Sequence, residues 1–168
     1  KFGQMAARTK MLIGLGVLLG IVVISVAAEV LYIKYNGTPV PAPTIPRGPQ
    51  ALGVGPKLTY VVMGDSTSIA QGADYADGYS FASAQHLADK YEVTFVNTGI
   101  SGATAERTLR QQLSDAVQYK PDLVLLAVGA NDTTHFTKGP AIQKSIQAIV
   151  DGLRAANPDV KIVVTRSP

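Results

Sequence analysis

Residues 58–68, with the sequence LTYVVMGDSTS, decide the fold of this chain. An apolar run rich in β-branched residues ends abruptly at Gly64 and is followed by small polar residues. This is the pattern of a buried parallel strand that delivers polar groups at its carboxyl end. In open α/β sheets, ligands bind in the crevice beyond such strand ends. Ser66 is therefore a candidate nucleophile, and an ordinary turn that happens to contain Ser and Asp is the alternative.

Downstream of this stretch, apolar runs alternate with segments of helical periodicity. Beyond the first strand at 58–63, we expect strands at 93–97, 122–128 and 160–165, and helices at 79–90, 104–118 and 140–155. Strands that alternate with helices of this length predict right-handed βαβ units and a parallel sheet. The predicted class is α/β, a flavodoxin-like three-layer α/β/α arrangement, and we expect its C-terminal part to lie beyond Pro168.

The N-terminal segment has the composition of a membrane span. Residues 11–28 contain no charged side chain, and the apolar character resumes after Glu29 as far as Ile33. A spanning helix needs roughly 20 apolar residues, and the basic Arg8 and Lys10 ahead of it orient the N-terminus toward the cytoplasm. We predict a cytoplasmic N-terminus at 1–10, a transmembrane signal-anchor helix at 11–33, and an extracytoplasmic domain at 57–168.

Two other interpretations of this segment stay open. A signal peptide cleaved after Ala28 would release the domain as a secreted protein. A buried core helix is disfavoured because polar residues line no face of the segment. Gly16 and Gly20 have the spacing that lets two membrane helices approach closely, so a weak helix-mediated dimer is a further expectation.

A proline-rich segment separates the predicted helix from the domain. Residues 34–56 hold six of the ten prolines in the chain. Such a sequence favours extended polyproline II structure and acts as a semi-rigid spacer. We predict a linker over 34–56.

Charge and composition exclude several classes of function. The net charge of +3 comes from the first 56 residues, because residues 57–168 carry ten Lys or Arg against eleven Asp or Glu. The domain therefore has no basic stripe for nucleic acid. The absence of cysteine excludes disulfides, thiolate zinc sites and a cysteine nucleophile. We predict no metal and no cofactor: Asp74 and Asp77 fit a solvated loop, and no GxGxxG follows the first strand.

Three short motifs lie at the ends of three predicted strands. They are GDST at 64–67, NTGISG at 97–102 and GAND at 129–132. Consecutive βα loops of a parallel sheet lie on one side of it, so all three can line one crevice. Together the motifs resemble the Ser, Gly and Asn blocks of the SGNH (GDSL-type) hydrolases, with Thr67 where Leu is often found. The resemblance covers residues 58–168.

This resemblance implies an esterase that acts through a serine. Ser66 would attack carboxylic esters such as acyl groups on lipids or O-acetyl groups on sugars. The oxyanion donors it implies are the N–H groups of Ser66 and Gly102 and the side-chain amide of Asn131. Taken singly, Gly102 could be a turn glycine and Asn131 a capping residue. We expect Asp65 and Asp132 to be structural.

The general base is missing from the printed sequence. Family members carry an Asp-x-x-His pair near the C-terminus. The one such spacing in this chain, Asp132 to His135, belongs to the third motif and does not match that C-terminal pair. His86 lies in a predicted helix, and His135 follows Asn131 by four residues but matches no family base. We therefore expect these 168 residues alone to be a poor catalyst and the natural chain to be longer. A non-catalytic ligand- or carbohydrate-binding module of the same fold, and an unrelated flavodoxin-like binding domain, are the rival functions.

Overall fold

The computed structural model describes residues 2–37, 43–46 and 48–165. The chain divides into two compact units, Lys1–Pro39 and Val40–Pro168. The first unit is the helix α1 (Phe2–Asn36), and its stretch Lys10–Asn36 is long and apolar enough to cross a membrane. At 1.5 Å per residue these 27 residues extend over about 40 Å, more than the roughly 30 Å of a hydrocarbon core.

The second unit is built on a five-stranded sheet with the strand order β1-β3-β2-β4-β5. The strands are β1 (Gln50–Leu52), β2 (Lys57–Gly64), β3 (Glu92–Asn97), β4 (Leu123–Ala127) and β5 (Lys161–Thr165). Strands β3, β2, β4 and β5 are parallel, whereas β1 pairs antiparallel with β3. The sheet is therefore mixed, with one short antiparallel strand at its edge.

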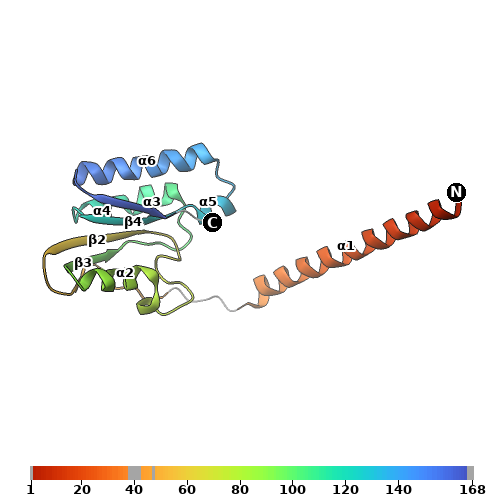
Figure 1. Ribbon diagram of the computed structural model, residues 1–168, viewed down its shortest axis with the longest axis horizontal. Coiled ribbons are helices and arrows are strands. Elements are labelled where there is room, and N and C mark those ends of the chain that lie inside the picture. The colour runs from red at the N-terminus through yellow and green to blue at the C-terminus, as the bar shows by residue number, and fades with distance from the viewer. Residues whose placement is uncertain (1, 38–42, 47, 166–168) are drawn as a thin grey trace. The chain divides into compact units, whose positions relative to one another are not determined.

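Helices cover both faces of this sheet, as Figure 1 shows. The helical elements are η1 (Tyr75–Asp77), α2 (Tyr79–Ala88), α3 (Ala105–Gln111), α4 (Leu113–Val117), α5 (Ala130–Thr134) and α6 (Gly139–Ala156). Helix α2 packs on one face, and α3, α4 and α6 pack on the other. The predicted α/β class with three layers is confirmed.

Strand β2 is the centre of the core, and its residues alternate between the two faces. Val61 and Met63 pack in the cluster that contains Ile149 and Leu153 of α6. Tyr60 and Val62 belong to the opposite cluster, with Ala84 of α2 and Phe95 of β3. All four β2 side chains are at most 2% exposed. A strand covered on both faces reads as a continuous apolar run, which is why residues 58–63 predict the fold so strongly.

The structure differs from the sequence-based expectation in three places. Strand β1 lies inside the segment predicted to be a linker, of which 38–42 and 47 are outside the described residues. The single helix expected at 104–118 is two helices, because the helix is interrupted at Gln112. The short helix α5 directly follows β4, where only a loop was expected.

Candidate active site

The turn after β2 is closed by the carboxylate of Asp65, which is 3% exposed. Its Oδ1 accepts hydrogen bonds from the backbone N–H and the hydroxyl of Thr67, both at 2.9 Å. The carbonyl of Ser66 accepts from Gln71 N–H at 2.9 Å. Ser66 itself is half-buried at the carboxyl end of the strand. The buried carboxylate thus shapes the turn that presents Ser66.

A second set of bonds holds the same turn to its neighbours. The buried Ser68 offers its carbonyl to Asn97 Nδ2 at the end of β3 and to Ser80 Oγ of α2, both at 2.7 Å. These bonds connect the β2 turn to one neighbouring strand and one covering helix. The position of Ser66 is therefore defined by contacts well outside its own turn.

The loop after β3 brings Gly102 to the same edge of the sheet. Gly102 is exposed and has φ +72°, a left-handed conformation that favours glycine. The carbonyl of the preceding residue, Ser101, accepts from Arg107 Nη1 at 3.3 Å. The Ser101 hydroxyl donates to Gln71 Oε1 of the β2 turn. The Ser101–Gly102 peptide is thus held from two sides.

The side-chain amide of Asn131, on α5 after β4, connects the other two loops. Its Nδ2 donates to Asp65 Oδ2 at 3.1 Å and to the Ala103 carbonyl at 3.1 Å. Asp65 directly precedes Ser66, and Ala103 directly follows Gly102. The three residues expected from the sequence therefore lie in loops that one amide group joins.

Two backbone N–H groups at this edge have no internal acceptor. Among residues 2–37, 43–46 and 48–165, neither Ser66 N–H nor Gly102 N–H donates a hydrogen bond. Gly102 is exposed and Ser66 is half-buried, so water can reach both N–H groups. Backbone donors on two adjacent loops that are free of protein acceptors are what an incoming oxyanion requires.

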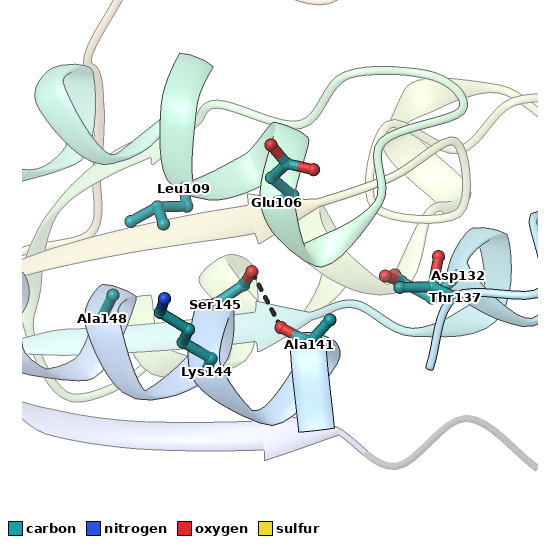
Figure 2. A pocket seen from close by; sticks show the side chains of 8 residues that line it. All are labelled: Glu106, Leu109, Asp132, Thr137, Ala141, Lys144, Ser145 and Ala148. Atoms are coloured by element: carbon teal, nitrogen blue, oxygen red, sulfur yellow. Dashed lines mark hydrogen bonds between the residues drawn. The ribbon is translucent and has the colours of Figure 1, made fainter. Parts of the chain in front are cut away.

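Asp132 follows Asn131 but serves a different part of the molecule. It is 1% exposed, and its Oδ2 accepts from Ala105 N–H at the start of α3 at 2.8 Å. Its Oδ1 has no hydrogen-bond partner among the described residues. Figure 2 shows Asp132 at one end of a cavity of about 320 Å³ between α3 and α6. This cavity is lined by Glu106, Leu109, Asp132, Thr137, Ala141, Lys144, Ser145 and Ala148.

Neither histidine occupies the position of a base for Ser66. The exposed His86 of α2 lies with Nδ1 3.4 Å from Asp89 Oδ2. The exposed His135 lies with Nδ1 2.7 Å from the Asn131 carbonyl. Within the described part of the chain, neither ring bonds to Ser66, and no group of three potential metal ligands is found.

The pKa of Tyr79, which lies beside the β2 turn, depends in part on the charge of Asp65. Burial raises the pKa of Tyr79, hydrogen bonding to Thr67 and Ser80 lowers it, and the negative charge of Asp65 raises it further. Tyr79 is 40% exposed and begins α2. Its phenol is therefore a local reporter of the Asp65 carboxylate.

Sequence reasoning missed two contacts of this site. One is the bond between Asp65 and Asn131, because residues 66 positions apart give no local signal. The other is the buried Gln112, which bonds to the end of β2. Its position could have been noticed, because 105, 109, 112 and 116 share one face of a helix and the other three are Ala or Leu.

The polar loops lie together at the carboxyl ends of the parallel strands. In α/β proteins, ligands bind in the crevice at this edge of the sheet. Residues 62–168 match the GDSL-like lipase/acylhydrolase family. The match covers more than half of the chain, and the chain belongs to this family. The resemblance to the SGNH (GDSL-type) hydrolases is thereby confirmed.

Three relatives illustrate the similarity. Esterase TesA of Pseudomonas aeruginosa is 30% identical over 111 residues, which are 66% of this chain and 55% of TesA. A crystal structure of TesA has a TM-score of 0.58 at 30% identity, over 63% of this chain and 58% of that one. The thioesterase 1/protease 1/lysophospholipase L1 of Escherichia coli K12 is 29% identical over 112 residues, 66% of this chain and 52% of that protein.

The third relative is the psychrotrophic esterase EstA from Pseudoalteromonas sp., whose structure was solved inhibited by monoethylphosphonate. It is 27% identical with a TM-score of 0.55, over 63% of this chain and 57% of that one. The chain spans about half the length of the curated relatives it matches.

Proposed function

We propose that the protein is a membrane-tethered, extracytoplasmic serine esterase in which Ser66 is the nucleophile. The observation that carries this proposal is the Asn131 amide, which contacts the neighbours of both Ser66 and Gly102 at 3.1 Å. Family membership and the esterase names of the relatives support the reaction class. The substrates would be carboxylic esters of the acyl-lipid or O-acetyl-sugar type.

The reaction would proceed through an acyl-enzyme. Ser66 Oγ attacks the ester carbonyl and loses its proton to a base, while the carbonyl oxygen becomes an oxyanion. The oxyanion accepts from Ser66 N–H, Gly102 N–H and Asn131 Nδ2, which stabilise it in the transition state. Collapse expels the alcohol, and water then releases the acid by the same steps. An Asp-x-x-His pair of the family type would supply the base.

Asn131 must exchange one of its present partners to take part. An amide nitrogen has two hydrogens, and here they point at Asp65 Oδ2 and the Ala103 carbonyl. Both bonds, at 3.1 Å, lie within the ordinary range of N–H···O distances. A substrate oxyanion is a stronger acceptor than the neutral Ala103 carbonyl and would replace it. Asp65 would keep the amide oriented throughout.

Serine-directed labelling tests the proposal. We expect a fluorophosphonate probe to label the full-length native protein and a control variant equally. The control is Ser114→Ala, which removes an exposed serine. The Ser66→Ala variant should lose the label completely. EstA, a relative inhibited by a phosphonate, makes this probe a suitable choice. Labelling that persists in Ser66→Ala would exclude Ser66 as the nucleophile.

The tether is proposed for residues 11–33, within the apolar stretch Lys10–Asn36 of α1. Protease added to spheroplasts should release the domain by cutting in the proline-rich segment. The N-terminus should stay with the membrane, because Arg8 and Lys10 favour the cytoplasmic side. A domain protected from protease in intact spheroplasts would contradict this topology. A domain already free in the medium would favour cleavage after Ala28.

A weak dimer through α1 is a separate part of the proposal. No atom lies within 4 Å of a Cβ built on Gly16 or Gly20, so both glycines leave room on the helix surface. Such a surface allows two membrane helices to approach closely. Cross-linking in membranes should decrease in a Gly16→Leu/Gly20→Leu variant and stay unchanged in a Gly14→Leu variant.

A non-catalytic binding module is the second candidate, and one observation favours it. Among residues 2–37, 43–46 and 48–165, neither histidine hydrogen-bonds to Ser66. A native protein that binds an ester-bearing ligand but neither turns it over nor reacts with the probe would support this candidate.

A further inference from the structure

A buried glutamine contacts the backbone immediately before the Asp65-Ser66 turn. Gln112, between α3 and α4, is 0% exposed. Its Oε1 accepts from Gly64 N–H at 2.9 Å, and its Nε2 donates to the Gly64 carbonyl at 2.8 Å. Both backbone groups of Gly64 are thus bound by one side chain.

Two longer contacts orient this side chain. The hydroxyl proton of Thr98 is shared between the Val62 carbonyl at 3.0 Å and Gln112 Oε1 at 3.3 Å, and Gln112 Nε2 donates to Thr108 Oγ1 at 3.4 Å. Both amide hydrogens therefore have an acceptor, and Oε1 accepts mainly from Gly64 N–H. A buried amide with its donors and acceptor paired is held in one orientation, whereas an unpaired one would be costly.

The Gln112 amide bonds to a β2 residue that lies beyond the end of the pairing with β3. The parallel pairing of β2 with β3 ends at Val62, opposite Asn97. Thr98 N–H still reaches the Val62 carbonyl, and Ile100 N–H reaches the Gly64 carbonyl. The acceptor for Gly64 N–H is Gln112 and not a residue of β3. Gln112 thus extends the hydrogen-bond ladder of β2 by the residue that leads into the turn.

The other surroundings of Gly64 leave it little freedom. A Cβ built on Gly64 would lie 2.7 Å from the Ala127 carbonyl and 3.0 Å from Ser68 Cβ. The strand end is therefore pressed against β4 and the Ser68 turn, and Gln112 binds its backbone. Two residues further on is Ser66.

We propose that Gln112 is a positioning residue for Ser66, acting through the backbone of Gly64. This inference rests on the proposed function of Ser66 as nucleophile. Loss of the two bonds would let the strand end shift, and a misplacement of about 1 Å can cost about 10²-fold in rate. A merely structural amide would lower stability without changing the reactivity of the folded molecules.

The test compares reactivity with stability in the full-length native protein. Gln112→Met keeps the length of the side chain and removes both bonds. Leu153→Ala removes apolar volume from the core between the sheet and α6 and destabilises the fold. It leaves the hydrogen bonds of Gly64, the last residue of β2, in place. Gln118→Met is the matched surface control, since Gln118 is exposed at the end of α4. The rate constant of fluorophosphonate labelling, the inhibitor binding constant and the melting temperature are measured for each variant.

We expect folded Gln112→Met to be labelled about 10- to 10²-fold more slowly, with probe binding changed less than threefold. Leu153→Ala should react at nearly the wild-type rate despite a lower melting temperature, and Gln118→Met should match wild type in both. A labelling rate for Gln112→Met no lower than that for Leu153→Ala would overturn the proposal.

A second variant decides the matter if Gln112→Met does not fold. Thr108→Val is nearly isosteric and removes one of the two contacts that orient the amide. It should slow labelling of the folded protein by about two- to fivefold and lower the melting temperature, because one hydrogen of the buried amide loses its acceptor. An unchanged labelling rate would overturn the proposal. Failure of the proposed function itself looks different, because wild type would then show no Ser66-dependent label at all.

Discussion

The turns after β2 and β4 each place a buried aspartate beside a residue of the site, yet the two aspartates have different partners. Asp65 precedes Ser66, and both of its oxygens are bonded, to Thr67 and to Asn131. Asp132 follows Asn131 and bonds through one oxygen to the start of α3, while its other oxygen has no partner among the described residues.

Both aspartates were expected to be structural, and this difference predicts that only Asp65 affects the candidate site. Asp65 links two loops of the crevice, so a change in it should be felt by both Ser66 and Asn131. Asp132 links α5 to α3, on the side of the sheet covered by α6. Burial alone would not distinguish the two carboxylates, since they are 3% and 1% exposed. Their hydrogen-bond partners do.

The largest effect is expected for the amide that Asp65 holds. In the full-length protein, Asn131→Ala should lower the turnover of a short-chain nitrophenyl ester by about 10²- to 10³-fold. The Michaelis constant should change little, because an oxyanion donor acts mainly in the transition state. Gln147→Ala, which removes an exposed amide from α6, is the control. Unchanged turnover in folded Asn131→Ala would remove Asn131 from the site.

An intermediate effect is expected for Asp65→Asn. Each Asp65 oxygen accepts from an N–H or O–H donor, so an amide nitrogen at either position would face a donor. The Asn131 amide or the Thr67 turn must then shift, and turnover should fall by about 10- to 10²-fold. Steady-state kinetics on the folded variant measures this loss. Wild-type turnover would show that the link between the two loops is irrelevant to the reaction.

Asp132→Asn should have a small effect, in contrast to Asp65→Asn. The bond to Ala105 N–H can be kept by the amide oxygen, and a neutral amide is cheaper to bury than a carboxylate with an unpaired oxygen. We expect turnover within about threefold of wild type and a melting temperature that is unchanged or higher. A turnover loss as large as that of Asp65→Asn would abolish the distinction between the two aspartates.

The smallest effect is on the titration of Tyr79. Burial is the main cause of its raised pKa, and the charge of Asp65 adds to it, because a nearby carboxylate disfavours the phenolate. Asp65→Asn should therefore lower the Tyr79 pKa, and Asp132→Asn should leave it unchanged. Phenolate absorbance during alkaline titration measures both, with Tyr79→Phe to assign the signal. Equal Tyr79 pKa values in wild type and Asp65→Asn would show that the charge of Asp65 does not affect Tyr79.

The positions of the candidate site residues were predictable because these residues follow apolar strands. The first strand was expected at 58–63 and is β2 at 57–64; the third was expected at 122–128 and is β4 at 123–127. Ser66, Gly102 and Asn131 then follow their strands by a few residues, and parallel topology brings consecutive strand ends to one edge. The contacts of each loop were not predictable to the same degree, because the partners are distant in sequence.

The sequence by itself determined the alternation of four strands with helical segments, the two apolar faces of β2, the candidate site residues and the apolar character of α1. These features depend on local periodicity and on the composition of single segments. The tertiary structure alone decided the antiparallel edge strand β1, which lies within the proline-rich segment and pairs Gln50 with Phe95. It also decided the break of the predicted helix at Gln112, whose partner Gly64 lies 48 residues earlier. Likewise, the different partners of Asp65 and Asp132 follow from which loops meet in space. The physical reason is that a hydrogen bond between distant segments depends on the packed sheet and leaves no periodic trace in the chain.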